Sequence, residues 1–298
     1  AFREFDSLEE VYLPRSLRKI GTCAFAGCKN LQEVRLGKDT RRIWESAFSQ
    51  CDALRVIHLP ASLEEVGEKA FLDCNALQDI HLEDVAAWVS IPDENILSEP
   101  ISNSRDGVRR FYLDGKLITD LVIPEGVTVI REHAFRGAED ITAIHYPSTI
   151  TDLGEYSLER CVNLQDIYLA DVAAYLNAAC QDYGTNPMEI NELPKNLYLK
   201  GKLVKELVIP GSVTSIRHGA FINCTGITSV KLESGVQKIG RSAFAGCTGL
   251  KSITYPDTLA WVGDDALLDC AALTDIHITD IRSWLNCERE NYNGNPMM

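Results

Sequence analysis

Several motifs that would mark an enzyme are missing from this sequence. It has no Gly-x-Ser-x-Gly, no glycine-rich phosphate loop, no His-Glu-x-x-His and no dinucleotide fingerprint. Such motifs gather a nucleophile, a phosphate cradle or a metal in one place, and catalysis needs a convergent group of this kind. We therefore expect no catalytic residues and no cofactor. Acidic pairs are plentiful, but in so acidic a chain they carry little information.

Positive charge is also scarce. The 298 residues include 29 Lys and Arg against 43 Asp and Glu, for a formal net charge of -14. The basic residues are scattered, whereas nucleic acids and anionic membrane surfaces attract clustered Lys and Arg. No apolar run approaches the roughly 20 residues of a membrane-spanning helix. We therefore expect neither nucleic-acid binding nor membrane insertion.

The ten cysteines lack the usual zinc spacing, because the sequence contains no Cys-x-x-Cys. Most of them recur at one position of a repeat, flanked by small residues, where a small buried hydrophobe fits. We expect free, buried thiols and no metal, although stacked repeats would bring such cysteines within disulfide range. The recurring cysteines are Cys28, Cys51, Cys74, Cys161, Cys224, Cys247 and Cys270.

What the sequence does contain is a 23-residue repeat, Leu-x-x-Val-x-Leu-Pro-x-x-Leu-x-x-Ile-Gly-x-x-Ala-Phe-x-x-Cys-x-x. A fixed period of this length indicates a solenoid, whose units bury one face against their neighbours and expose a long surface. Such a surface favours binding over catalysis. Full copies begin at Leu8, Leu31, Leu54, Ile118, Ile141, Val204, Ile227 and Leu250. Partial copies begin at Leu77, Leu164 and Leu273.

Each repeat divides into two halves. The alternation in Leu-x-x-Val-x-Leu predicts a short strand whose first, fourth and sixth residues point inward. Proline at the seventh position ends it, because proline has no N–H for the ladder. The second half fits either a helical turn or an irregular, strand-like segment, and the period does not decide between them. We expect its Phe to wedge between coils, and the strands to form one parallel sheet on the concave side.

The register breaks at LQDIHLEDVAAW, LQDIYLADVAAY and LTDIHITDIRSW. In each, an Asp precedes a short amphipathic run, as a helix N-cap does. The sequences FYLDGKLITDLVIP and LYLKGKLVKELVIP then predict β-hairpins turned at Asp114-Gly115 and Lys200-Gly201, since glycine accepts the positive φ of tight turns. We expect one continuous solenoid over residues 1–298. Its repeat blocks are 1–84, 118–171 and 204–280, its helix–loop–hairpin connectors are 85–117 and 172–203, and a third connector begins at 281–298.

The units resemble the BspA-like leucine-rich repeats, whose hallmark is L-x-x-[VI]-x-[LI]-P followed by I-G-x-x-A-F-x-x-C. The resemblance covers essentially the whole chain. Local departures include Ala138 in place of Cys and Arg131 and Arg217 in place of Gly. The resemblance implies an α/β repeat fold, a right-handed leucine-rich-repeat solenoid with two helix–hairpin connectors. It also implies secreted or surface-anchored proteins of host-associated bacteria with adhesion or protein-binding roles, and no catalytic residues.

The third and fifth residues of each strand form two exposed columns, one mostly acidic and one rich in Tyr and His. Tyr and His offer contact area together with hydrogen bonds, which suits recognition. The alternative is a solvated sheet face without a ligand. The candidate partner-binding residues are Tyr12, Arg35, His58, Asp79, His81, His145, Asp166, Tyr168, Asp275 and His277.

Two narrower alternatives concern single clusters. His58 and His81 are expected side by side with Asp79 close, which would suit a divalent metal, but a bare pair is weak evidence. The connector aromatics Trp88, Tyr175 and Trp284 are expected to pack the connector helix onto the solenoid, with carbohydrate stacking as the alternative.

The sequence as a whole predicts a non-catalytic protein-binding or adhesion module of a secreted or cell-surface bacterial protein. Its partner would be a host-surface or extracellular-matrix protein, or a glycan. A passive stalk that displays another domain is the first alternative, and an enzyme is the second. Residues 1–7 fit the last seven positions of the repeat. We therefore expect a fragment of a longer chain, without its leader, that is monomeric or associates end to end.

Overall fold

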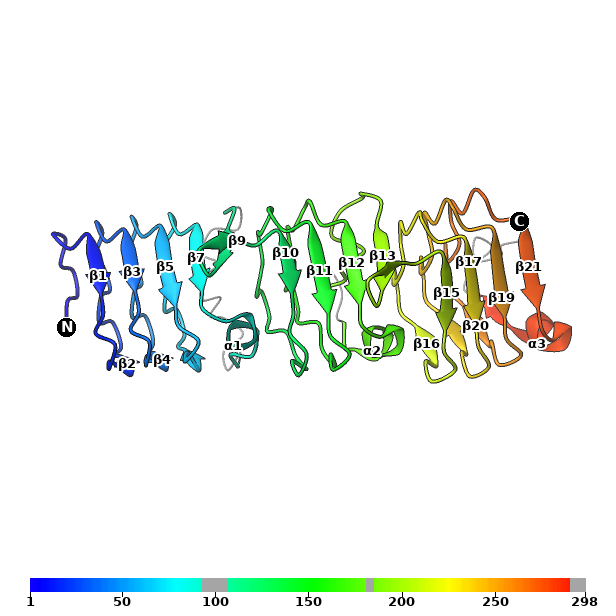
Figure 1. The fold of residues 1–298 in the computed structure, drawn as a ribbon, viewed down its shortest axis with the longest axis horizontal. Coiled ribbons are helices and arrows are strands. Elements are labelled where there is room, and N and C mark those ends of the chain that lie inside the picture. Colours follow the sequence, from blue (N-terminus) through cyan, green and yellow to red (C-terminus); the bar gives the residue numbers. More distant parts are fainter. Residues whose placement is uncertain (93–106, 181–184, 290–298) are drawn as a thin grey trace. The chain divides into compact units, whose positions relative to one another are not determined.

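The computed structural model describes residues 1–92, 107–180 and 185–289. The chain forms two compact units. Figure 1 labels their helices and strands. Unit 1 consists of Ala1–Ile141 with Gly154–Val162, and unit 2 of Thr142–Leu153 with Asn163–Met298.

Unit 1 is built on a parallel sheet in the order β1-β3-β5-β7-β8, and β9 joins its edge in antiparallel fashion. A second row of short parallel strands follows the order β2-β4-β6. The first sheet comprises β1 (Glu10–Tyr12), β3 (Glu33–Arg35), β5 (Val56–Leu59), β7 (Asp79–Leu82), β8 (Arg110–Leu113) and β9 (Lys116–Leu117). The second row comprises β2 (Lys19–Ile20), β4 (Arg42–Ile43) and β6 (Glu65–Val66), and β10 (Asp120–Val122) follows the hairpin.

Unit 2 repeats this plan. Parallel pairs join β11, β12 and β13, with β14 antiparallel at the edge, and two further parallel sheets follow the orders β15-β17-β19-β21 and β16-β18-β20-β22. The strands are β11 (Ala143–Tyr146), β12 (Asp166–Leu169), β13 (Asn196–Leu199), β14 (Lys202–Leu203), β15 (Glu206–Ile209), β16 (Ser215–Ile216), β17 (Ser229–Leu232), β18 (Lys238–Ile239), β19 (Ser252–Tyr255), β20 (Trp261–Val262), β21 (Asp275–Ile278) and β22 (Glu288–Arg289).

Both units thus confirm a parallel-sheet solenoid. Each strand pairs with the strand one repeat away, so that Val34 lies opposite Ile57. The first, fourth and sixth positions of the inner repeats are buried as predicted, as in Leu54, Ile57 and Leu59, whereas Leu8, Leu13, Leu273, Ile276 and Ile278 of the two terminal repeats are half-buried. In every inner coil, the apolar side chains at these positions are removed from contact with water, and this burial is the main favourable contribution to folding. The handedness of the coil and the division into blocks and connectors stay predictions.

The second half of each repeat is neither a helix nor a full strand. In most repeats it consists of a two-residue strand followed by consecutive turns, and in the repeats that start at Ile118 and Ile141 a single bridge residue takes the place of the strand. Two positions are left-handed in successive repeats, as at Cys23 (φ 53) and Gly27 (φ 74). The turns place the Phe rings in a stack, with Phe25 and Phe48 5.2 Å apart and Phe48 and Phe71 5.3 Å apart between centroids. The predicted wedge of Phe between coils is therefore confirmed.

The recurring cysteines have a role that the sequence did not reveal. The thiol of Cys51 donates a hydrogen bond to the backbone oxygen of Phe25, at 3.2 Å, and Cys74 does the same to Phe48 at 3.1 Å. A buried carbonyl without a donor is costly, so the thiol serves as a donor as well as a small hydrophobe. All ten cysteines lie in the described residues, and all are free thiols. Burial raises the pKa of Cys161 and Cys224 to about 12.

Three short helices interrupt the coils, namely α1 (Val85–Val89), α2 (Val172–Asn177) and α3 (Ile281–Asn286). Each begins after an Asp whose carboxylate accepts a backbone hydrogen bond in the first turn, as from Ala87 N to Asp84 at 2.6 Å. The N-cap prediction is thus confirmed. The aromatic residues of these helices, Trp88, Tyr175 and Trp284, are buried. They pack the helices onto the coils, and their burial removes the carbohydrate-stacking alternative.

The replacement of the repeat's Gly by Arg has a structural reason. At Gly67 and Gly240, an added Cβ would lie 2.6 Å from backbone atoms of the preceding coil. Arg131 and Arg217 belong to the first coil after a helix, where an aromatic ring takes that place. The Arg131 guanidinium lies 4.3 Å from the ring of Trp88, and that of Arg217 lies 4.0 Å from the ring of Tyr175. These distances are typical of cation–π contacts.

Candidate binding surface

Planar side chains form a continuous row across the first sheet of unit 1. The parallel register places the fifth residue of each repeat beside that of the next. The rings of His58 and His81 stack at 4.3 Å, and those of His81 and Tyr112 at 4.4 Å. At the other end, the Arg35 guanidinium lies 5.8 Å from the ring centroid of Tyr12. We call Tyr12, Arg35, His58, His81 and Tyr112 the unit 1 ladder.

A shorter row of the same kind crosses β11, β12 and β13 in unit 2. The rings of His145 and Tyr168 stack at 4.0 Å, and those of Tyr168 and Tyr198 at 4.2 Å. We call these three residues the unit 2 ladder. In both ladders the strand spacing of ~4.8 Å brings the rings to nearly the distance at which aromatic planes stack.

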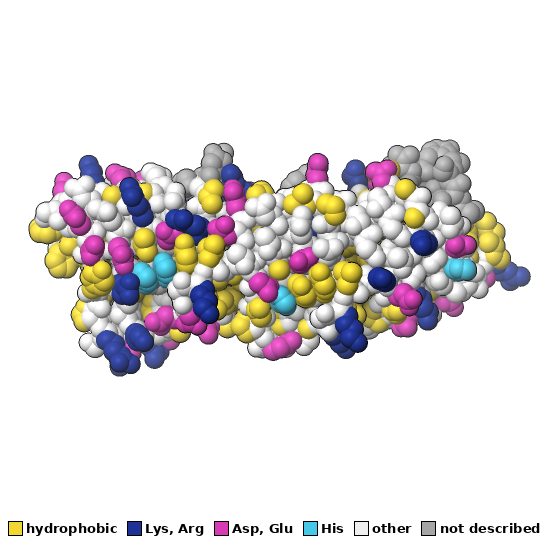
Figure 2. Space-filling view, turned by 45° about the horizontal axis from the view of Figure 1, so that its top comes forward, with side chains coloured by type: hydrophobic (Ala, Val, Ile, Leu, Met, Phe, Trp, Pro, Cys, Tyr) yellow, Lys and Arg dark blue, Asp and Glu magenta, His cyan; other side chains and the backbone are white. Residues whose placement is uncertain are grey.

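Stacking decides what the ladders offer to a partner. Each inner ring covers the faces of its neighbours, so the faces are not available for a sugar ring. The outward edges carry polar atoms, namely imidazole nitrogens and phenol hydroxyls, which donate and accept hydrogen bonds. Figure 2 shows histidine side chains at the surface with acidic and basic side chains around them.

Tyr112 and Tyr198 were not among the residues that the sequence predicted. They lie on the first strands of the two hairpins. The turn of the first hairpin has positive φ at Asp114 (50) and Gly115 (73), as predicted. That first strand pairs in parallel with the preceding repeat, which places Tyr112 opposite His81. The signal was available, because FYL and LYL align with the strand halves of DIHL and DIYL.

Two acids of the column, Asp79 and Asp166, are paired with side chains of the hairpin strands. The Asp79 carboxylate lies 2.6 Å from the Arg110 guanidinium. Asp166 accepts a hydrogen bond from the Asn196 amide at 2.7 Å. Arg110 and Asn196 precede Tyr112 and Tyr198 by two residues, so each hairpin strand extends both columns. Asp79 is thus engaged by an arginine rather than aimed at the two histidines.

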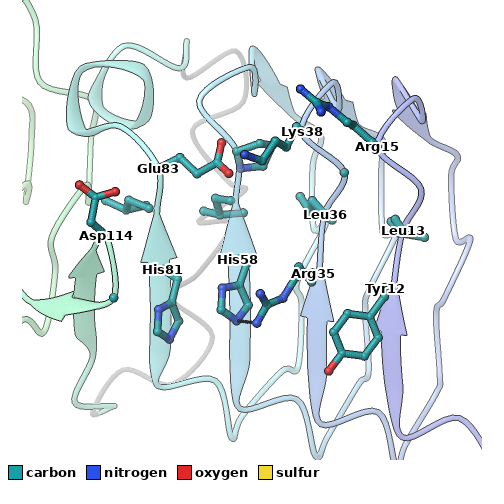
Figure 3. A pocket seen from close by; sticks show the side chains of 15 residues that line it. Tyr12, Leu13, Arg15, Arg35, Leu36, Lys38, His58, His81, Glu83 and Asp114 are labelled. Carbon is teal, nitrogen blue, oxygen red and sulfur yellow. Dashed lines mark hydrogen bonds between the residues drawn. The ribbon is translucent and has the colours of Figure 1, made fainter.

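His58 lies at a junction of charges. Its Nε2 is 3.3 Å from Nη2 of Arg35 (Figure 3). The same nitrogen is 3.2 Å from Oε1 of Glu33. Burial, together with the positive charges of His81 and Arg35, lowers the pKa of His58, and burial also lowers the pKa of His81. Arg35 Nη2 also donates a hydrogen bond to Glu33 Oε1 at 3.2 Å, so Arg35, Glu33 and His58 are in mutual polar contact.

This geometry does not fit a shared metal ion. Two stacked imidazoles, inclined by only 17°, have nearly parallel lone pairs, which do not converge on one point as metal ligands do. Within the described residues, no group of three or more His, Cys, Asp or Glu side chains has a metal-binding arrangement.

The remaining predicted residues lie apart from both ladders. Asp275 and His277 are on β21, where His277 lies opposite Thr254 rather than an aromatic residue. The Asp275 carboxylate accepts a hydrogen bond from the hydroxyl of its neighbour Thr274, at 2.9 Å. The predicted set therefore divides into two ladders with their acidic neighbours and a separate pair on β21.

A groove with a volume of about 580 Å³ runs beside the unit 1 ladder. Tyr12, Arg35, His58 and His81 line one side (Figure 3). The sixth-position leucines of β1, β3, β5 and β7 and the segments that follow these strands complete the lining, together with the hairpin turn. The leucines are Leu13, Leu36, Leu59 and Leu82. The polar residues that follow are Arg15, Lys38, Glu83 and Asp114.

Known proteins identify the repeat. A family model described as the BspA type leucine rich repeat region matches residues 1–93, 108–199 and 191–286, in 6 copies. The chain belongs to this family. BspA type repeats are typically non-catalytic, and leucine-rich-repeat proteins generally bind other proteins. No curated protein matches the chain.

The chain is also similar to solved structures of bacterial proteins. A leucine-rich repeat protein from Bacteroides ovatus is 21% identical, with 97% of this chain and 76% of that chain covered and a TM-score of 0.50. A leucine rich cell surface protein from Faecalibacterium prausnitzii is 23% identical, with 97% and 65% covered and a TM-score of 0.36. The pneumococcal vaccine antigen PcpA is 17% identical, with 97% and 59% covered and a TM-score of 0.36. The chain thus spans less than two thirds of the last two.

Helices of this BspA type chain are short. None within the described residues has the length and apolar character required to cross a bilayer.

Proposed function

We propose that this BspA type chain is a non-catalytic protein-binding or adhesion module of a secreted or cell-surface bacterial protein. Its binding residues would be the two ladders and their acidic neighbours. The observation that carries the proposal is the stacking of rings across consecutive strands, which fixes a row of hydrogen-bonding edges on an exposed sheet.

A fixed row of this kind lowers the entropic cost of binding a partner. Side chains that are free in solution lose rotamer entropy when a partner binds. His58, His81 and Tyr168 are already held by stacking neighbours, so they lose less. Tyrosine and arginine are also enriched among the residues that dominate interface energies, and the unit 1 ladder contains both.

The location is proposed from relatives and from the family. The Faecalibacterium prausnitzii structure is described as a cell surface protein, and the resemblance stated above implies secreted or anchored proteins. We propose the same location for this chain, with a host-surface or extracellular-matrix protein as the partner. A passive stalk would have the same fold but would need no binding contribution from the ladders.

Binding to an array of purified host-surface and matrix proteins tests the proposal. We expect at least one protein to bind, and the triple variant Tyr12→Ala, His58→Ala and Tyr168→Ala to weaken that binding about tenfold or more, since hot-spot side chains each contribute more than about 1 kcal/mol. Trp44→Ala is the matched control, because Trp44 is exposed but lies in the second half of a repeat. A chain that binds nothing on the array, or a triple variant that binds as wild type does, would instead favour the stalk.

A further inference from the structure

The unit 1 groove, defined by the lining residues given above, has a polarity along its length. Arg15 follows β1 and Lys38 follows β3, whereas Glu83 follows β7 and Asp114 lies in the hairpin turn after β8. Figure 3 shows Arg15 and Lys38 at one end of the groove and Asp114 at the other. Arg15 and Lys38 thus mark the β1 end and Asp114 marks the β8 end, with the Glu83 carboxylate between them.

The two cations are exceptional among the repeats. Arg15 and Lys38 both occupy the eighth position, directly after the residue that ends the strand. Every other repeat has a neutral or acidic residue there. These residues are Ala61, Asp84, Glu125, Ser148, Asp171, Gly211, Ser234, Asp257 and Asp280. The chain has a net charge of -14, and only the two repeats beside the groove have a basic residue at the eighth position. The repeat pattern does not explain this difference.

Both cations are available to a ligand. Arg15 and Lys38 are exposed, and neither takes part in an ion pair within the part of the chain that the structure describes. Arg35, by contrast, is held by Glu33 at 3.2 Å. One oxygen of Glu83 accepts a hydrogen bond from Ala61 N at 3.2 Å, which holds that carboxylate over the coil of β5, in the middle of the groove, and leaves Asp114 at the far end (Figure 3).

The middle of the groove is apolar. Leu36, Leu59 and Leu82 form part of its lining, with Pro60 beside them. The volume lies within the range of roughly 300–1,000 Å³ that is typical of ligand-binding pockets. Four strand spacings of ~4.8 Å separate β1 from β8, and an extended chain rises ~3.3 Å per residue, so about six residues of peptide would span the groove.

We propose that the unit 1 groove binds an extended, acidic peptide segment of the protein partner. Its carboxylates would contact Arg15 and Lys38, its apolar side chains the leucines, and a basic side chain at the other end Asp114. This inference rests on the proposed protein-binding function and adds the chemistry of the bound segment. A polyanionic glycan or an anionic membrane matches only the cationic end, because Glu83 and Asp114 repel it.

A random heptapeptide display library, selected on the whole chain, tests the proposal. We expect the enriched peptides to carry Asp or Glu at one end, apolar residues in the middle and Lys or Arg at the other end. The double variant Arg15→Glu and Lys38→Glu, measured by fluorescence anisotropy, is expected to bind these peptides about tenfold more weakly or worse. Both sites are exposed, so the variant is expected to keep its fold, which circular dichroism checks.

The matched control places the same charge change elsewhere. Lys231→Glu and Lys251→Glu alter exposed lysines of unit 2, and we expect this variant to bind the peptides as wild type does. Equal losses of peptide affinity in both variants would show that the effect comes from the net charge of the chain, and would overturn the proposal. A library without enrichment, or enrichment without acidic residues, would overturn it as well. The ladder variants on the protein array report on the proposed function separately, so the two failures are distinguishable.

Discussion

Phe48→Ala is expected to lower the free energy of unfolding by about 3–5 kcal/mol, the usual loss for a buried Phe. Phe48 is 0% exposed, and its ring lies between those of Phe25 and Phe71 in a stack with interplanar angles of 2° and 4°. Removing it opens a cavity between two coils, and rigid backbone turns on both sides keep the cavity from closing. Urea unfolding followed by far-UV circular dichroism measures the loss.

Phe2→Ala is the control for this change, because Phe2 also stacks on Phe25 but is 49% exposed. We expect it to cost less than half as much. Equal losses for Phe2→Ala and Phe48→Ala would show that the inner stack is not a major source of stability.

Lys195→Met is expected to lower the free energy of unfolding by about 1–3 kcal/mol, because it removes three hydrogen bonds and takes the donor from the Leu193 oxygen, whereas the Leu164 oxygen and Asn191 Oδ1 keep other donors. Lys195 is 0% exposed. Its ammonium donates to the backbone oxygens of Leu164 at 3.1 Å and Leu193 at 3.3 Å, and to the side-chain oxygen of Asn191. All three acceptors are uncharged. Lys202→Met, at an exposed site on β14, is expected to change stability by less than about 0.5 kcal/mol.

The pH dependence gives this prediction a second readout. Burial lowers the pKa of Lys195 to about 8, whereas an unfolded lysine keeps a pKa of about 10.4. Between these values the unfolded chain binds more protons, so the contribution of Lys195 to stability rises with pH. The difference in stability between wild type and Lys195→Met should therefore widen, by about 1 kcal/mol between pH 8 and pH 9. A difference that stays constant or shrinks would contradict a buried, destabilised ammonium.

The pH dependence must be compared between Lys195→Met and wild type, because other groups make stability fall as the pH rises. The raised pKa of Cys224, about 12, and that of Tyr175 mean that the unfolded chain loses these protons first as the pH rises. Their contributions to stability fall with pH, but they are common to both proteins and cancel in the difference.

The repeat made much of the fold predictable. Alternation in Leu54, Ile57 and Leu59 fixed the inward face, because a strand has a side-chain period of two. Asp84 was readable as an N-cap and Asp114-Gly115 as a hairpin turn, because both features depend on neighbouring residues alone. The sequence did not decide between a helical turn and a strand-like segment for the second half of the repeat. The structure has left-handed turns there, and the residue pattern does not predict them, because residues as different as Cys23 and Lys69 adopt positive φ.

The binding surface was less predictable, because it depends on contacts between distant segments. Tyr112 and Tyr198 join the ladders because each connector returns in parallel with the preceding repeat; the likeness of FYL and LYL to the repeat strands pointed to them, but the 23-residue period breaks before both residues. Arg15 and Lys38 lie outside the two columns that the strand pattern predicts. Their groove exists because the hairpin turn at Asp114 lies at its far end.

Hydroxyl-radical footprinting with a partner from the protein array tests the central claim most directly. The claim is that partners bind across the ladders and not across the second halves of the repeats. We predict that the partner lowers the oxidation of Tyr12, which is 60% exposed, and of His81, while Trp44 oxidises at the same rate in the free and bound states. Protection of Trp44 with unchanged oxidation of Tyr12, His81 and Tyr168 would contradict it.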